Sequence, residues 1–276
     1  MAKYPQDVYG VNMVDSDYEL LRTGMEKSES GFAESFEFCE SENGWKLLRY
    51  KGDDAIVIIP AFYQNKKITD MSNDVFVCNG NIKKVFFPNT LRIVGGLKNC
   101  TGVERVVVPF GVKSVYAEAF AGCTSLKSLD LPDSATDLGY CFCENCASLE
   151  TVELSEKLRE LPDRSFKNCA SLFGVNIPYV LESVGDEAFC GCVSLREIEL
   201  PVHIKSIGDY AFAFTRPKRL IVLPNCEYIG KKAFFNKRPE RFEVLIAEKN
   251  KNWSHAWKKG CVVRIHPSIK DTLYDD

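Results

Sequence analysis

Cysteine is the residue type whose number and spacing in this sequence could support chemistry. The chain has 276 residues and 12 cysteines. Cys141, Cys143 and Cys146 form a C-x-C-x-x-C motif, and Cys190 and Cys192 form a C-x-C motif. Thiolates bind zinc when four ligands converge as a tetrahedron. These five residues are therefore the candidates for a metal centre, and the rest of the cysteine pattern decides between that interpretation and a structural one.

A regular spacing favours the structural interpretation. Five cysteines follow one another at equal intervals: Cys100, Cys123, Cys146, Cys169 and Cys192. Asn79 and Thr215 take the same place near the two ends of this series. Equivalent positions of stacked repeats form a column, and Cys, Asn and Thr can all bond to turn backbone. We expect reduced thiols in a structural ladder and no metal or other cofactor; a metal or redox role of Cys141, Cys143 and Cys190 stays open.

Histidine gives no support for catalysis. His203, His255 and His266 are far apart in the sequence. None of them lies beside a recognisable Ser or Cys nucleophile motif, and the sequence contains no glycine-rich phosphate loop. We therefore expect that this protein is not an enzyme.

Whole units of the chain repeat, and each unit predicts one strand. Residues 119–132, AFAGCTSLKSLDLP, match residues 188–201, AFCGCVSLREIELP. Apolar residues one, three and six positions before the end of each strand alternate as a buried face requires. The predicted strands end at Pro60, Pro88, Pro109, Pro132, Ser155, Pro178, Pro201, Pro224 and Ala247. Proline suits these ends, because it cannot donate to a sheet.

The segment after each strand is expected to close the coil as a short helix or irregular turn. Gly185 and Gly208 lie in these segments, and we expect glycine to supply backbone freedom there. A phenylalanine column is expected to fill the outer side of the core. Its members are Phe76, Phe120, Phe142, Phe166, Phe189, Phe212 and Phe234.

Composition excludes some classes of partner. The net charge is −3, and Lys and Arg are scattered, without the basic stripe of nucleic-acid-binding proteins. The sequence contains no apolar run long enough for a membrane-spanning helix. Residues 1–21 have no apolar core of a signal peptide. We expect a cytoplasmic protein with reduced cysteines, or a surface or secreted one if a leader has been removed.

The repeats divide the chain into four parts. Residues 1–34 lack the pattern and are expected to form an extension with a short helix. Residues 35–60 predict a cap, in which Asn43-Gly44 turns a hairpin before the first strand. Residues 61–247 carry the repeats. Residues 248–276 are expected to form a second cap, a short helix anchored by Trp253 and Trp257 and followed by a strand.

The unit SLREIELPVHIKSIGDYAFAFT resembles the BspA-like leucine-rich repeats, a bacterial and protist branch of the leucine-rich repeat family. The resemblance covers about residues 36–250 and includes the lead-in FEFCESENGWKLLRYKGDDAIVIIP. It implies an α/β leucine-rich repeat solenoid with a curved parallel β-sheet on its concave side, short helical or irregular convex segments, and a cap at each end. Members of this family are often exposed on the cell surface and bind other proteins or host matrix.

The concave sheet is the usual binding face of a solenoid. The residues that point outward from the predicted strands divide this face into three zones. The first turns are apolar and basic, the middle turns are acidic, and the last turns are apolar. The candidate binding residues are Phe86, Arg105, Val107, Asp130, Glu153, Asn176, Glu197, Glu199, Leu220 and Val222. We expect a non-catalytic protein-interaction module whose unknown partner carries a basic strip. An interpretation without binding is equally compatible with the sequence. In it, the two caps cover the apolar turns, and the acidic turns between them are simply exposed to solvent. An adhesin-like or carbohydrate-binding surface module is the alternative function, and the sequence leaves the oligomeric state open.

Overall fold

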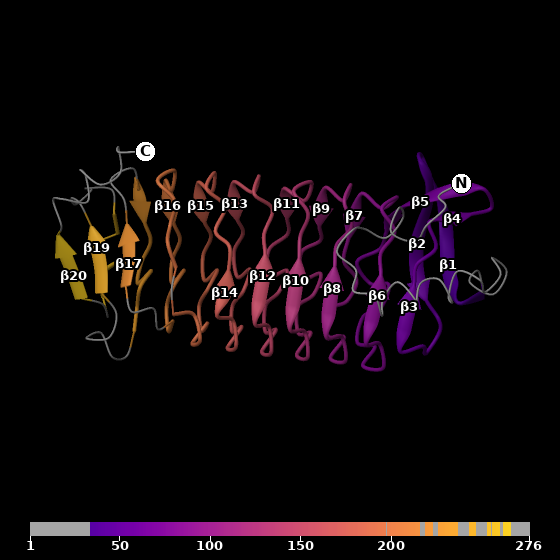
Figure 1. Ribbon diagram of the computed structural model, residues 1–276, viewed down its shortest axis with the longest axis horizontal. Coiled ribbons are helices and arrows are strands. Elements are labelled where there is room, and N and C mark those ends of the chain that lie inside the picture. The colour runs from indigo at the N-terminus through magenta and orange to yellow at the C-terminus, as the bar shows by residue number, and fades with distance from the viewer. Residues whose placement is uncertain are drawn as a thin grey trace.

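The computed structural model describes residues 34–196, 198–215, 219–222, 226–236, 243–246, 253–254, 256–259 and 262–265. These residues form an elongated solenoid in which successive turns of the chain stack side by side (Figure 1). All of the elements within the described ranges are strands. The predicted helix before residue 35 falls on residues outside these ranges.

One parallel sheet, the main sheet, runs along the solenoid and corresponds to the predicted concave sheet. Its strands pair in the order β14-β12-β10-β8-β6-β3. They are β3 (Ile56–Ile58), β6 (Lys84–Phe86), β8 (Arg105–Val107), β10 (Ser128–Asp130), β12 (Thr151–Glu153) and β14 (Gly174–Val175). The register places residues of adjacent turns side by side, as in the pair Leu129 and Val152. These six strands confirm the expected positions before Pro60 through Pro178.

The main sheet ends earlier than the sequence predicts. Arg196 and residues 198–200 are not in a strand, although REIELP matches the repeat well. The preceding strand β14 has only two residues. The side chain of Asn176 bonds to the backbone of Leu154, at 2.5 and 3.0 Å, where other turns use a backbone carbonyl. Asn176 thus continues the connection between these two turns with its side chain where β14 has ended.

A second series of short parallel strands, the second ladder, replaces the expected helical segments. One part contains β7 (Ile93–Val94), β9 (Ser114–Val115) and β11 (Asp137–Leu138). The other part contains β13 (Glu160–Leu161), β15 (Ser183–Val184), β16 (Ser206–Ile207) and β18 (Tyr228–Ile229). Turns connect this ladder back to the main sheet. Of the two predicted closures, short helix or irregular turn, the short helices are not confirmed, because two-residue strands and tight turns close the described coils of 23 residues.

The expected glycines have a different role from the one predicted. Gly139, Gly185 and Gly208 have no positive φ, so backbone freedom is not the reason for them. A Cβ atom at Gly139 would lie 2.0 Å from the backbone nitrogen of Ala117, and one at Gly208 would lie 2.6 Å from that of Asp186. Glycine is required here because adjacent turns approach too closely for a side chain.

The N-terminal end contains the predicted hairpin. Strands β1 (Phe36–Ser41) and β2 (Gly44–Tyr50) pair antiparallel, with the turn at Glu42 and Asn43, one residue before the predicted position. Sequence reasoning missed a second hairpin, β4 (Phe62–Tyr63) with β5 (Lys66–Met71). Strand β5 pairs parallel with β2. The backbone carbonyl of Thr69 in β5 accepts a hydrogen bond from the N–H of Arg92, which connects the hairpins to the start of the second ladder.

The C-terminal end continues the stack. Strands β17 (Arg219–Val222), β19 (Glu243–Ile246) and β20 (Val262–Ile265) form a parallel sheet. Trp253 and Trp257 are both buried, as predicted for apolar anchors. The Trp253 Nε1–H donates to the Cys226 carbonyl at 3.0 Å. Residues 256–259 form a turn instead of the expected helix.

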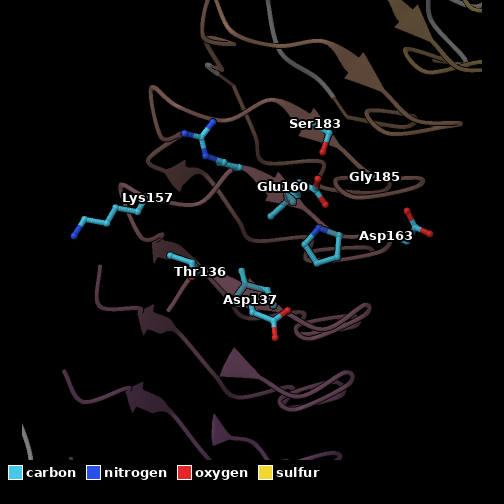
Figure 2. A pocket seen from close by; sticks show the side chains of 11 residues that line it. Thr136, Asp137, Lys157, Glu160, Asp163, Ser183 and Gly185 are labelled. Atoms are coloured by element: carbon cyan, nitrogen blue, oxygen red, sulfur yellow. The ribbon is translucent and has the colours of Figure 1, made fainter. Parts of the chain in front are cut away.

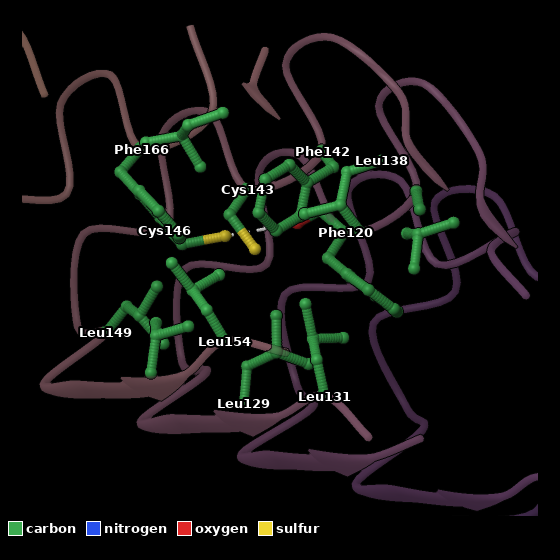
Figure 3. Packing of buried hydrophobic residues seen from close by; sticks show 14 of the residues in the cluster. Phe120, Leu129, Leu131, Leu138, Phe142, Cys143, Cys146, Leu149, Leu154 and Phe166 are labelled. Atoms are coloured by element: carbon green, nitrogen blue, oxygen red, sulfur yellow. Dashed lines mark hydrogen bonds between the residues drawn. The ribbon is translucent and has the colours of Figure 1, made fainter. Parts of the chain in front are cut away.

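The core is one continuous apolar column between the two ladders. Its strand residues and phenylalanines interlock from turn to turn, as Figure 3 shows for Leu129, Leu131, Phe120 and Phe142. Ring centroids of consecutive phenylalanines lie 5.2 to 5.9 Å apart from Phe142 to Phe234. The predicted aromatic column is therefore confirmed for the buried rings of this stretch.

Candidate functional site

The outward side chains of the main sheet form the candidate binding surface, which we call the main-sheet strip. Strand alternation places one set of residues inward, such as Val106 and Leu129, and their neighbours outward. Parallel register then aligns Arg105 with Ser128, and Asp130 with Glu153. Along the described strands the strip therefore runs from apolar and basic to acidic, and the predicted apolar end involves side chains outside the described residues.

The first part of the main-sheet strip combines apolar and basic side chains. Ile56 is 37% exposed, and Phe86 and Val107 are half-buried. Lys84 and Arg105 are neighbours in the parallel register. A partner on this part of the strip would meet hydrophobic side chains flanked by positive charge.

An ion pair marks the boundary between the basic and acidic parts. The Arg105 Nη2–H donates to Asp130 Oδ2 at 2.9 Å, and both side chains are about one-third exposed, at 34% and 27%. The Arg105 Nε is buried and has no hydrogen-bond partner. The adjacent Glu153 is exposed and has no described cation partner. This end of the strip is therefore a fixed charged surface, with Glu153 available to a basic partner.

Not every predicted residue belongs to the strip. Asn176 is half-buried and is occupied by bonds to Leu154 and to the Glu156 carboxylate, at 2.9 Å. Its role is to hold the end of β12. Glu199 is exposed but lies beyond the last described strand of the main sheet. Glu197 lies outside the described residues, as do the side chains of Leu220 and Val222, whose backbone forms part of β17.

The cysteine column is a structural ladder, as predicted. Each thiol donates to a backbone carbonyl of the preceding turn: Cys100 to Phe76, Cys123 to Leu97, Cys146 to Phe120, Cys169 to Cys143 and Cys192 to Phe166, at 2.9 to 3.1 Å. Asn79 is half-buried at the start of the column, and its Oδ1 accepts from Asn81 N–H at 3.1 Å. At the other end, the Thr215 hydroxyl bonds within its own turn, to Phe212 at 2.5 Å.

The buried environment raises the pKa of most thiols of the column, whereas hydrogen bonds with Cys143 and Cys169 lower the pKa of Cys146. The eleven cysteines of the described ranges are free, and most of them are buried. Burial raises the pKa of Cys100 to about 11 and raises the pKa of Cys123 and Cys192 further. Within the part of the chain that the structure describes, no three His, Cys, Asp or Glu side chains gather as metal ligands would. The motifs around Cys141 and Cys190 therefore show no ligand cluster.

A groove that sequence reasoning missed lies on the second ladder. It has a volume of about 590 Å³ and spans three turns, from Thr136 through Pro162 to Gly185. Figure 2 shows Lys157 at one end of it and Asp163 at the other. The sequence did contain a signal for this groove: Pro162 takes the place that glycine has in neighbouring turns, after Leu138, Val184 and Ile207.

The described residues contain no helix long and apolar enough to cross a membrane. No curated protein matches this chain. Solved structures that share its fold include the following two. A leucine-rich repeat protein from Bacteroides ovatus is 20% identical, with a TM-score of 0.66 over 83% of this chain and 68% of its own. A leucine-rich cell surface protein from Faecalibacterium prausnitzii is also 20% identical, with a TM-score of 0.53 over 79% and 76%.

A family profile agrees with the observed turns. The profile described as "BspA type Leucine rich repeat region" matches six copies, in overlapping stretches at residues 58–142, 95–213 and 138–254. These stretches contain the main sheet, the second ladder and the cysteine column described above. The chain belongs to the BspA-type leucine-rich repeat family.

Proposed function

We propose that this protein is a non-catalytic interaction module that binds a partner protein across its main-sheet strip. The observation that carries the proposal is the graded strip itself, in which the Arg105–Asp130 ion pair joins an apolar, basic part to the exposed Glu153. Charges fixed on a rigid sheet select a partner by electrostatic complementarity.

The partner that fits is a protein with a basic patch beside an apolar one. Glu153 offers an exposed carboxylate, and Ile56, Phe86 and Val107 offer apolar contacts. Three grooves of the described residues are lined by the second ladder, by turns and by the N-terminal hairpin, and none of these three is lined by the strip.

Affinity capture with matched variants tests this proposal. The purified chain would be the bait in lysate of the source cells, beside a Glu153→Lys variant. A second variant, Glu227→Lys, makes the same charge change at an exposed position away from the main sheet. We expect a protein that the wild type and the control variant retain and the strip variant loses. Equal recovery by all three baits would contradict the strip as the binding surface.

A surface adhesin-like or carbohydrate-binding module is the second candidate. The Faecalibacterium structure with this fold is named a leucine-rich cell surface protein. Exposed aromatic side chains also line the turns after the strands: Phe110 is 71% exposed, and Tyr179 is 64% exposed and packs edge-on to His203 at 4.9 Å. Aromatic rings of this kind can stack on apolar ligand surfaces. Protease treatment of intact source cells would test location, since a surface protein is degraded and an internal one survives.

A further inference from the structure

The second ladder follows one hydrogen-bonding pattern. Between β9 and β11, the N–H groups of Thr136 and Asp137 share the carbonyl of Lys113, at 3.1 and 3.2 Å. Two residues further on, the Gly139 N–H donates to Val115 at 2.8 Å. The same three-bond pattern joins β13 to β15 and β15 to β16.

This pattern is missing between β11 and β13. No backbone hydrogen bond of the described residues joins Arg159 or Glu160 to the carbonyl of Thr136, and none joins residue 162 to Leu138. The second ladder is consequently divided into two sheets at this point. The carbonyls of Thr136 and Leu138 are therefore open to a ligand, and so are the N–H groups of Arg159 and Glu160.

Pro162 explains the break. It occupies the place of Gly139 and Gly185 but has no N–H to donate. Tyr116 also replaces glycine in this series, yet it retains its donor and bonds to Val94 at 3.0 Å. The missing donor, rather than the presence of a side chain, thus distinguishes the broken junction from the others.

The opening is local, because the neighbouring turns are joined on both sides of it. On one side, Glu156 N–H donates to Asp133 Oδ1 at 3.0 Å. On the other, Cys141 N–H donates to the carbonyl of Asp163 at 2.9 Å. The break is therefore a preformed feature of the fold, and the groove of about 590 Å³ lies directly on it.

The groove has opposite charges at its two ends. Lys157 lies at one end and Asp163 at the other (Figure 2). Asp137 and Glu160 are exposed beside the open backbone groups. Arg159 is on the basic side and is held by an ion pair with Glu182. A ligand that crosses this groove would meet a positive group first, then open backbone donors and acceptors, and then carboxylates.

We propose that the break between β11 and β13 is a docking site for an extended peptide segment of a partner protein. The segment pairs its backbone with the open groups of Thr136, Leu138 and Glu160, as an added strand does at a sheet edge. An acidic side chain of the segment faces Lys157, and a basic side chain faces Asp163. This site is independent of the main-sheet strip.

A random-peptide phage library selected on the purified chain tests the proposal. Pro162→Gly is the matched variant, because it supplies the missing N–H and is expected to close the ladder as Gly139 and Gly185 do. Peptides enriched on the wild type should bind Pro162→Gly at least about tenfold more weakly, since several backbone hydrogen bonds lose their partners. Enriched sequences should carry an acidic residue at one end and a basic residue at the other.

Two further measurements make the test decisive. Lys157→Glu should remove the preference for the acidic residue without closing the groove, while Glu153→Lys on the main sheet should leave peptide binding unchanged. Hydrogen exchange should show fast amides at Arg159 and Glu160 in the free protein and slow amides in the peptide complex. Failure to enrich any peptide, or equal binding to wild type and Pro162→Gly, would overturn the proposal.

Discussion

The thiol of Cys169 donates a hydrogen bond to the backbone carbonyl of Cys143, 3.1 Å away in the preceding turn. Every other thiol of the column reaches a Phe or Leu at this place. Cys143 therefore occupies the phenylalanine position of its turn, and Phe142 is shifted by one residue while remaining buried against Phe166. The sequence analysis assigned Phe142 to that position, and this is wrong by one residue, since the 23-residue spacing from Phe120 and from Phe166 falls on Cys143.

The thiol ladder should contribute measurably to stability. Cys123→Ala removes a buried hydrogen bond to Leu97 and leaves a small cavity, so we expect the free energy of unfolding to fall by about 2 kcal/mol. Cys123→Ser keeps a donor and should lose less. Urea unfolding under reducing conditions measures both. Cys78→Ala, at an exposed position, is the control and should change stability little; an equal loss there would refute the ladder's role.

Stability should decrease at alkaline pH. Burial raises the pKa of Cys100 from 9.0 to about 11, so the unfolded thiol ionises first. Stability from this residue is fully present below pH 9 and decreases between pH 9 and about 11, by about 2 to 3 kcal/mol in total. Cys226, with a pKa raised to about 12, adds to the slope. Urea midpoints from pH 7 to pH 10 test this, and Cys100→Ser should flatten the curve; a slope unaffected by that change would contradict the assignment.

Close approach of the turns predicts a severe effect of a small substitution. Gly139→Ala would place a Cβ 2.0 Å from the Ala117 nitrogen. We expect a loss of about 3 kcal/mol in unfolding free energy, because the backbone of an adjacent turn must move. Gly80→Ala would meet only the Thr101 hydroxyl, at 3.3 Å, and serves as the control. Thermal unfolding that gives the same midpoint for both variants would disprove the close-approach explanation.

The Arg105–Asp130 ion pair should be a modest contributor to stability. Both side chains are partly exposed, so a double-mutant cycle with Arg105→Ala and Asp130→Ala should give a coupling energy of about 0.5 to 1 kcal/mol that decreases with salt. Such a value would indicate that this pair is maintained for the charge it presents rather than for folding. A coupling energy well above this range, insensitive to salt, would instead identify it as a structural element.

The repeat pattern predicted most of the main sheet and the thiol column, because each depends on residue types at one fixed spacing. It could not predict the second ladder, since two-residue strands carry no alternation that distinguishes them from turns. It also predicted a strand before Pro201, where Arg196 and residues 198–200 are not in a strand. The break at Pro162 was visible as a missing glycine, but its consequence required knowledge of which N–H donates to which carbonyl.

Hydrogen exchange of the chain with and without its captured partner tests the central claim most directly. Binding across the main-sheet strip should slow exchange in β8, β10 and β12, and the Glu153→Lys variant should abolish this protection while leaving the thiol ladder intact. Protection confined to the second ladder or to the turns, with the main sheet unchanged, would contradict the strip as the interaction surface.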